Sequence, residues 1–216
     1  LKQLDSLYGS AKVIGLAIHA GPANFTAVSA DYPTDFTTED GDDIASLFTV
    51  WGLPLGMVNR LDYPTNAHLK TYSSWTALAA TELSLAPEVL FNAYSGYDST
   101  SRVGTLRVEL RAQAPQSNAV GLAVYLKESG IVSPQLMPDQ TRDANYVHNN
   151  VFRSAPWGPF GQEVWAAGTT TAQSTASYDV SATFDAGWNP KQMHWIAFAY
   201  DRSTYRVLQA VQIDVK

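Results

Sequence analysis

The stretch RVGTLRVELRA, residues 102–112, alternates apolar and charged side chains at every second position. The apolar side chains are Leu106, Val108 and Leu110, and the charged side chains that alternate with them are Arg107, Glu109 and Arg111. Because successive side chains of a β-strand point to opposite sides, this stretch predicts a strand with one buried and one solvated face. Strands of this kind belong to antiparallel sheets.

The same alternation recurs through the second half of the chain. AVGLAVYLKE (119–128) and SYDVSATFDA (177–186) follow it, and MHWIAFAYDRSTYRVLQAVQIDVK (193–216) predicts a hairpin that turns around residues 201–204. Three shorter candidates are EVLFNAY (88–94), YVHNNVFRS (146–154) and QEVWAAG (162–168). The total of about eight strands is what a β-sandwich requires.

The first 85 residues follow different periods. Residues 13–18 are apolar almost without a break, which predicts a strand buried on both faces, as in a parallel sheet. LGMVNRL (55–61) predicts a second strand, and residues 21–37, with two prolines, predict a loop. The change of period near residue 85 indicates a partial α/β domain over residues 1–85 and an antiparallel β-sandwich over residues 86–216.

Three helices are predicted in the front part. LKQLDSLYGS (1–10) stops at Gly9, TTEDGDDIASLFTVWG (37–52) is capped by Thr38 or Asp40, and NAHLKTYSSWTALAATELS (66–84) follows. Each helix is expected to face the core with one stripe of apolar side chains. In chain order, the three stripes are Leu1, Leu4, Leu7 and Tyr8; Ile44, Leu47, Phe48 and Trp51; and Leu69, Tyr72, Trp75, Ala79 and Leu83.

Composition and motifs narrow the range of possible functions. The net charge is −6 and no segment is strongly basic, which argues against a nucleic-acid partner. The chain has no cysteine, which excludes a disulfide scaffold, a thiolate metal site and a thiol nucleophile within it. Phosphate-loop, zinc-helix and dinucleotide motifs are missing from the sequence, so we expect no catalytic residues, no metal and no cofactor.

The chain offers no membrane span of its own. No run approaches the ~20 apolar residues that a spanning helix needs, so we expect contact with a membrane only through an anchor outside this chain. The chain starts at Leu1 and its first residues resemble the end of a longer helix. We therefore expect a signal or anchor segment upstream.

Pro54 separates the helix at 37–52 from the strand predicted at 55–61. The alternative to a cis bond is a trans proline that only stops the helix. Cis costs an X-Pro bond only ~0.5–1 kcal/mol, so a tight turn can enforce it. In thioredoxin-like folds a proline in this place is cis and faces the redox site. We predict a cis Leu53–Pro54 bond and count Pro54 as a candidate binding residue.

Several motifs together resemble one family. They are IHAG (18–21), DFTTEDG (35–41), FTVWGLPLGMVNR (48–60) and YVHNNVFR (146–153), with Gly161. The chain resembles the twenty-eight-kilodalton outer-membrane lipoprotein family of Gram-negative bacteria. The resemblance implies a thioredoxin-like domain at 1–85 that lacks its first strand and redox motif, a β-sandwich at 86–216, and export. It also implies lipid anchoring to the outer membrane, and the family has been described as adhesin-like.

Three polar residues are candidates for a site or for a structural role. His19 ends the buried strand predicted at 13–18, where α/β sites form, although bonds to loop backbone are the simpler expectation. His148 and Arg153 lie five positions apart on one predicted strand and should point to opposite faces, which argues against one shared site. For both we expect structural roles, and Arg153 is expected to bind a carboxylate bidentately and tie the two domains together.

Four tryptophans lie in or beside the predicted strands: Trp157, Trp165, Trp188 and Trp195. Exposed tryptophans stack on sugar rings or bind a protein partner, and we name Trp157 and Trp165 as candidate binding residues. Buried tryptophans that fill the sandwich are the alternative, because the side chain carries a large apolar area.

These patterns leave three functional hypotheses. The leading one is a non-enzymatic, exported outer-membrane binding or adhesion module with a protein or carbohydrate ligand. The first alternative is a thiol–disulfide oxidoreductase whose Cys-x-x-Cys lies upstream of Leu1, where family members often carry it at a helix start. The second is a carbohydrate-binding β-sandwich. The sequence does not determine the oligomeric state.

Overall fold

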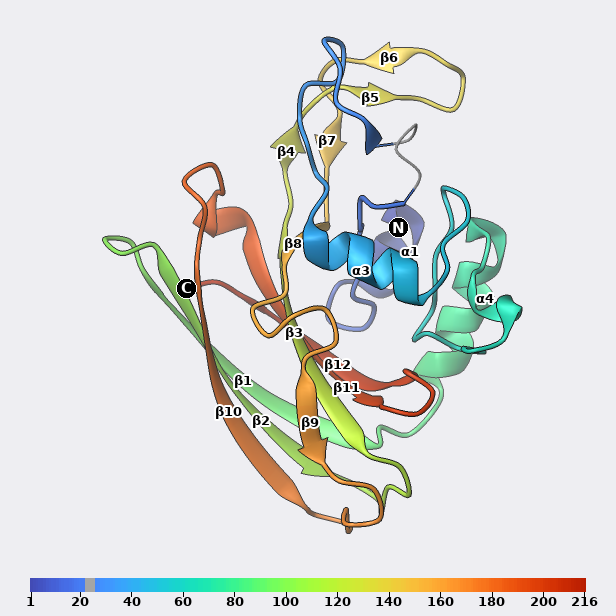
Figure 1. Ribbon diagram of the computed structural model, residues 1–216, viewed down its shortest axis with the longest axis vertical. Coiled ribbons are helices and arrows are strands. Elements are labelled where there is room, and N and C mark those ends of the chain that lie inside the picture. The colour runs from blue at the N-terminus through green and yellow to red at the C-terminus, as the bar shows by residue number, and fades with distance from the viewer. Residues whose placement is uncertain (22–25) are drawn as a thin grey trace.

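The computed structural model describes residues 1–21 and 26–216, and its fold is mostly β (Figure 1). Two β-sheets pack face to face, and α1, α3 and α4 lie on the outer side of one of them. Pro22 of the predicted loop and Asn24 of the glycosylation pattern Asn-x-Thr at 24–26 lie outside the described residues.

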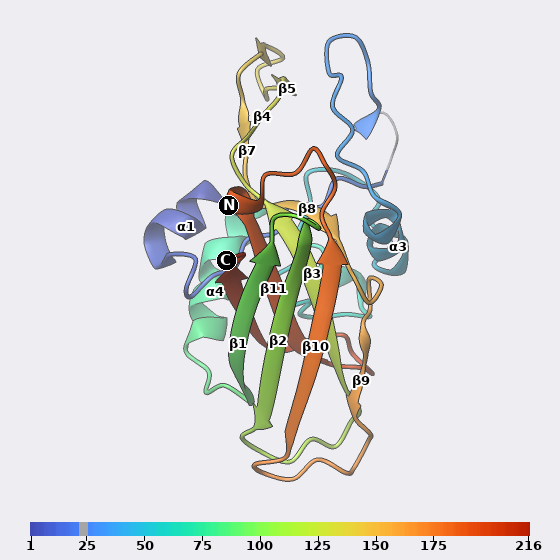
Figure 2. The ribbon, with the colours of Figure 1, turned by 90° about the vertical axis from the view of Figure 1, so that its left-hand side faces the viewer.

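The two sheets are antiparallel throughout. The first has the order β1-β2-β10, formed by β1 (Val89–Asp98), β2 (Val103–Ala112) and β10 (Thr175–Thr183). The second has the order β12-β11-β3-β8, and β9 also pairs with β3. Its strands are β3 (Val120–Glu128), β8 (Val151–Ser154), β9 (Gln162–Trp165), β11 (Met193–Asp201) and β12 (Val207–Asp214). In Figure 2 the first sheet lies in front of the second. The antiparallel, β-rich character predicted for this half is confirmed.

A first apolar core fills the space between the sheets. The alternating residues of β2 are buried in it: Leu106, Val108 and Leu110. Trp195 of β11 and Val124 of β3 belong to the same core. On the outer face of β2, Arg107 lies 3.4 Å from an Asp179 carboxylate oxygen of β10. The alternation therefore separates core from solvent as the sequence predicts.

A second apolar core covers the outer face of the five-stranded sheet. For this reason β3 is buried on both faces, whereas its alternating sequence predicts one solvated face. The members of this core come from both halves of the chain: Ile44, Phe48, Ala123, Tyr125, Phe152, Ala155, Ile196, Phe198 and Tyr200. The front part of the chain thus packs directly on the sandwich.

The first two helices begin where the sequence predicts. Helix α1 (Lys2–Tyr8) ends at Gly9, whose φ is 72°. Helix α3 (Glu39–Leu47) is capped by Thr38, whose side chain accepts the Gly41 N–H. The helix ends at residue 47 rather than 52. Consequently Phe48 is buried but Trp51 is 74% exposed, so the expectation that Trp51 faces the core was wrong.

The helix predicted at 66–84 is interrupted. It divides into η1 (Asn66–His68) and α4 (Tyr72–Leu83), because Lys70 between them pairs with Gly56 in an isolated antiparallel bridge. Ala79 of the expected stripe is buried, whereas Tyr72 is 75% exposed and Leu83 is exposed. Another short helix, η2 (Pro190–Gln192), precedes β11. Among the described residues, no helix has the length and apolar character of a membrane span.

The parallel strand predicted at residues 13–18 does not form. This segment is extended, but its pairing with β8 is a single parallel bridge between Ala17 and Val151. Its even-numbered side chains pack on the second core: Ile14, Leu16 and Ile18. On the other side, a Cβ on Gly15 would lie 3.2 Å from the Asn150 side chain and 3.5 Å from that of Leu1. The apolar run therefore reflects contacts on both sides of a single extended segment, residues 13–18, which we call the strap. The thioredoxin-like arrangement is not confirmed.

The second predicted strand, at 55–61, is also wrong. Turns replace it, and Asn59 and Arg60 have φ values of 49° and 55°. Two successive residues in the left-handed region are incompatible with an extended ladder. The Leu53–Pro54 and Tyr63–Pro64 peptide bonds that flank this segment are both cis.

Residues 129–150 form an arm that projects beyond the sandwich (Figures 1 and 2). It contains two short ladders: β4 (Ile131–Val132) with β7 (Val147–His148), and β5 (Gln135–Leu136) with β6 (Arg142–Asp143). Residues 26–37 contact the arm, because Arg142 donates two hydrogen bonds to the Asp31 carbonyl and Ser133 donates one to Thr34 Oγ1.

We predict that Gly161→Ala strongly destabilises the fold. Gly161 has a φ of 55°, and a Cβ on it would lie 2.0 Å from the Leu122 carbonyl oxygen of β3. Neither backbone can move without breaking the β3–β9 pairing, so we expect the free energy of unfolding in urea to fall by about 3 kcal/mol or more. Gly52→Ala is the control, because a Cβ there meets nothing within 4 Å. Equal stability of the two variants would contradict this account.

Candidate functional site

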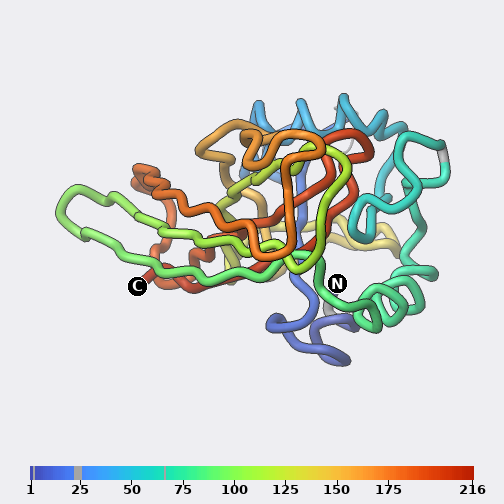
Figure 3. The backbone as a smooth tube through the Cα atoms, turned by 90° about the horizontal axis from the view of Figure 1, so that it is seen from below, coloured from blue at the N-terminus to red at the C-terminus, as the bar shows by residue number. Residues whose placement is uncertain are grey.

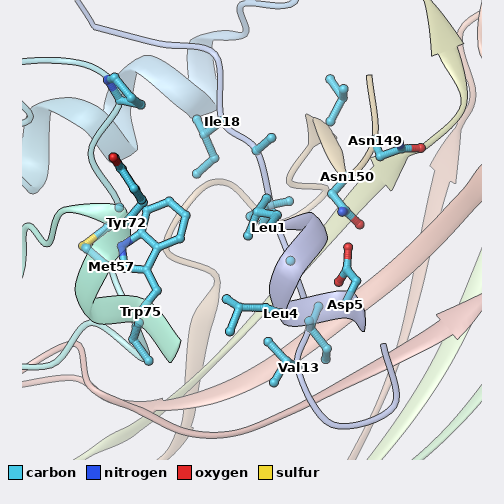
Figure 4. A pocket seen from close by; sticks show the side chains of 18 of the residues that line it. Leu1, Leu4, Asp5, Val13, Ile18, Met57, Tyr72, Trp75, Asn149 and Asn150 are labelled. Atoms are coloured by element: carbon cyan, nitrogen blue, oxygen red, sulfur yellow. The ribbon is translucent and has the colours of Figure 1, made fainter. Parts of the chain in front are cut away.

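A large groove lies between α1 with residues 11–19 on one side and α4 with residues 53–59 on the other (Figure 4). Its volume is about 1620 Å³. Its lining extends to parts of residues 26–37 and of residues 133–151, and to residues 206–210 beside β12. The groove therefore runs between the front segments, the arm and the edge of the five-stranded sheet.

The walls of the groove are mainly apolar. Figure 4 shows Trp75, Tyr72 and Met57 on one side. The facing side chains come from α1 and the strap: Leu1, Leu4, Val13 and Ile18. Two aromatic side chains thus face a row of aliphatic ones, a lining typical of small-molecule and peptide sites.

Trp75 is held in place by the loop opposite its helix. Its indole N–H donates to the Lys70 carbonyl at 3.2 Å. A Cβ on Gly56 would lie 2.5 Å from the indole ring, so only glycine lets the loop approach this closely. Pro54 lines the same groove. The motif around Leu53-Pro54 therefore shapes one wall of the groove. Pro54, which the sequence indicates as a candidate binding residue, lies in this wall.

Lys127 links the strap to the sandwich. This β3 side chain is almost completely buried, and Nζ donates to the Gly15 carbonyl at 2.8 Å and to Asn150 Oδ1 at 2.7 Å. Burial lowers the pKa of Lys127 to about 8, and the nearby Asp5 carboxylate partly opposes that shift. The sequence reasoning missed this residue, because a lysine near the end of an alternating strand reads as solvent-facing.

His19, Phe36, His148 and Arg153 form a compact group, which we call the Phe36 cluster. The Phe36 ring centroid lies 5.0 Å from that of His19 and 4.7 Å from that of His148. The Arg153 guanidinium lies 5.7 Å from the same ring. The prediction that His148 and Arg153 point to opposite faces and share no site was therefore wrong. Asn150 between them has a φ of 61°, which breaks the strand and cancels the alternation.

Both histidines of the cluster favour their neutral forms. Burial, with the nearby His148 and Arg153, lowers the pKa of His19 to about 4. Burial also lowers the pKa of His148, and hydrogen bonds to the Ser133 and Pro134 backbone partly offset the shift. Nε2 of His148 donates to the Ser133 carbonyl at 3.1 Å, whereas Nδ1 of His19 is buried without a hydrogen-bond partner in the described structure.

Arg153 is paired within the sandwich. Its Nε and Nη2 atoms both lie 2.8 Å from Oε2 of Glu128, and both side chains are largely buried. The expected bond to a carboxylate therefore exists, but it engages one oxygen and joins β8 to β3. The contact of Arg153 with the front part of the chain is its position over Phe36.

A second arginine, Arg60, is buried among aromatic rings. Its guanidinium lies 5.0 Å from the Phe48 ring centroid and 4.9 Å from that of Phe198, and Nη2 donates to the Tyr125 hydroxyl at 3.1 Å. Nη1 is buried without a hydrogen-bond partner among the described residues. The motif at 48–60 thus supplies both the ring and the cation of this contact, which the sequence did not indicate.

The four tryptophans named from the sequence are not exposed. Trp165 and Trp195 are buried in the first core, and Trp157 and Trp188 are half-buried against it. They fill the sandwich, as the alternative interpretation expects. The described residues contain no group of three or more His, Cys, Asp or Glu that could hold a metal ion.

Comparison with protein families shows to which family the chain is related. The family described as outer membrane protein Omp28 matches residues 42–216. The chain belongs to the Omp28 family. The resemblance drawn from its motifs is thereby confirmed, and so is the exported, outer-membrane location. No curated protein matches the chain.

Solved structures give more distant similarities. A domain of the outer membrane lipoprotein Omp28 from Porphyromonas gingivalis is 16% identical, with a TM-score of 0.42, over 61% of this chain and 91% of that one. The putative ApaA protein from Bordetella pertussis is 7% identical, with a TM-score of 0.23, over 60% and 89%. The Pseudomonas fluorescens alkylpurine DNA glycosylase AlkC is 12% identical, with a TM-score of 0.26, over 80% and 43%.

We predict that Lys127→Met weakens the attachment of residues 13–17. The variant leaves the Gly15 carbonyl and the Asn150 amide oxygen without their donor, so the free energy of unfolding should fall by about 2 kcal/mol. Hydrogen exchange of residues 13–17 should rise with it. Lys191→Met is the control, because Lys191 is exposed and such changes stay within about 0.5 kcal/mol. Unchanged exchange at 13–17 would refute the role assigned to Lys127.

Proposed function

We propose that this Omp28-family chain is a non-enzymatic binding or adhesion module of the outer membrane, and that its ligand, a segment of another protein, occupies the groove beside α4. The observation that carries the proposal is the groove itself, with its volume of about 1620 Å³ and its two aromatic side chains. Lipid anchoring belongs to the same proposal, and it is supported by the similarity to the P. gingivalis Omp28, which is an outer membrane lipoprotein.

The exposure of the groove supports binding rather than a purely structural role. Tyr72 is 75% exposed on its wall, although a tyrosine carries a large apolar ring. Aromatic side chains are enriched among the residues that dominate protein–protein binding energies. An apolar peptide segment would cover the Tyr72 side chain.

Two titratable groups that border the groove, Arg206 and His148, support a non-enzymatic role because they already hold structural partners. Arg206 lies 3.5 Å from a Glu88 oxygen and 3.6 Å from a Glu82 oxygen, which joins the ends of α4, β1 and β12. His148 is bound to the Ser133 carbonyl. Groups committed in this way are poorly suited to transfer protons to a substrate.

The other hypotheses have less support. A sugar platform built on Trp157 and Trp165 lacks the exposed ring faces that stacking needs. The redox alternative depends on cysteines outside this chain, which itself contains none. A thioredoxin-like relationship for residues 1–85 stays part of the proposal, supported by the order of a capped helix followed by an X-Pro turn.

The proposal predicts that Tyr72→Asp weakens ligand binding. A phage-displayed library of random dodecapeptides is selected on the wild-type chain, and the recovered peptides are titrated against each variant. Burying a charge where an aromatic anchor bound should weaken the recovered peptides at least about tenfold.

Tyr94→Asp is the matched control for this experiment. Tyr94 is also an exposed tyrosine, at 58%, but it lies on β1 of the opposite sheet and outside the groove. We expect its substitution to leave peptide affinity within about twofold of wild type. Selected peptides that bind the Tyr72→Asp chain as tightly as wild type would refute the groove as the binding site.

A further inference from the structure

We propose that the Phe36 cluster is an acid-sensitive clasp, which holds residues 13–21 and 26–37 against the arm at neutral pH and releases them when His19 and His148 are protonated. The inference does not rest on the proposed binding function. It rests on where the two imidazoles lie and on the charge that already surrounds them.

The cluster joins four separate parts of the chain. His19 directly follows the strap, and Phe36 precedes α3. His148 belongs to β7 of the arm, and Arg153 belongs to β8. The two imidazole centroids are 6.1 Å apart, and Phe36 contacts both rings. Phe36 therefore joins the two imidazoles into one junction, and a positive charge on both rings would oppose their approach.

Other contacts hold the same segments besides the cluster. The strap is bonded to β8 through Ala17, whose N–H donates to the Asn150 carbonyl and whose carbonyl accepts the Phe152 N–H. It is bonded to β3 through Lys127, which donates to the Gly15 carbonyl, and its apolar side chains pack on the second core. Residues 26–37 are bonded to the arm through the Ser133–Thr34 hydroxyls and through Arg142 with the Asp31 carbonyl. An electrostatic penalty at the cluster therefore opposes these contacts at the same junction.

The charges around the cluster do not favour additional protons. Arg153 carries one positive charge. The negative charge of Glu128 is already paired with it. Of the carboxylates nearest in sequence to Phe36, Asp35 accepts from Thr37, Asp40 accepts the Ala155 N–H, and Glu39 is exposed to solvent. The other ring against His148 is Tyr146, which is uncharged. Two imidazolium ions would therefore add positive charge beside Arg153, and the described structure gives neither imidazole an ion pair with a carboxylate.

The direction of the effect follows from proton linkage. The pKa of His19 is about 4 in the closed structure against an ordinary value of 6.5, and the pKa of His148 is lowered too. The open form therefore binds more protons between these values, and closure is favoured above pH 6.5 and lost as the pH falls towards 4. Between pH 7.5 and pH 5.0, His19 alone shifts the equilibrium about 30-fold towards the open form.

Hydrogen–deuterium exchange of the full chain, corrected for the intrinsic effect of pH, tests the clasp. From pH 7.5 to pH 5.0 we expect protection of residues 13–20 and 131–137 to fall by about 30-fold relative to that of β3 and β11. The choice of pH 5.0 leaves ordinary carboxylates mostly ionised. Unchanged relative protection in the wild-type chain would overturn the proposal.

Variants separate the clasp from general acid loosening. In the double variant with His19→Gln and His148→Gln, the acid-induced loss should shrink to less than about threefold, because neither side chain takes up a proton. His194→Gln is the control, since His194 lies in β11 beside Asp214 and outside the cluster. It should keep the full loss. A double variant that loosens as much as wild type would overturn the proposal.

A second measurement keeps the test decisive if the double variant does not fold. NMR titration of the wild-type imidazoles gives the protonation of His19 and His148 directly. We expect both to titrate below 6.5 and exchange at residues 13–20 to rise over the same pH range. Titration of His19 at or above 6.5 would refute the clasp.

Discussion

The second core, on the outer face of the five-stranded sheet, is the contact on which the rest of the structure depends. Tyr125 of β3 with Phe198 and Tyr200 of β11 form an aromatic surface too large to leave in water. Helix α3 covers it with Ile44 and Phe48. The front half of the chain is therefore a cover for the sandwich, and its irregular segments are explained by what they cover.

Three buried cations lie where this cover meets the sandwich, and each has particular partners. The Lys127 ammonium group donates to one backbone and one side-chain oxygen, and Arg60 places its guanidinium among aromatic rings. Arg153 is paired with Glu128 within the sheet. Buried cations are costly unless they find acceptors or ring faces, so the contacts of Lys127 and Arg60 orient the front segments as well as stabilise them.

The groove and the Phe36 cluster have a common origin in this arrangement. The cover is made of separate segments, namely a strap, the helices α1, α3 and α4, and turns, and segments that do not form a continuous layer leave space between them. The groove lies where α4 and the strap diverge, and the cluster lies where the strap, α3 and the arm converge. Membership of the Omp28 family places this cover on a protein of the outer membrane.

The sequence by itself determined the sandwich and the starts of the first two helices, because alternation in β2 and the cap at Thr38 are local effects of side-chain direction and hydrogen bonding. It also carried the family relationship. Tertiary structure alone decided that residues 13–18 form a strap, because a strap in contact on both sides is as apolar as a buried strand. It alone brought His148 beside Arg153, since one left-handed residue, Asn150, reverses the face that spacing implies.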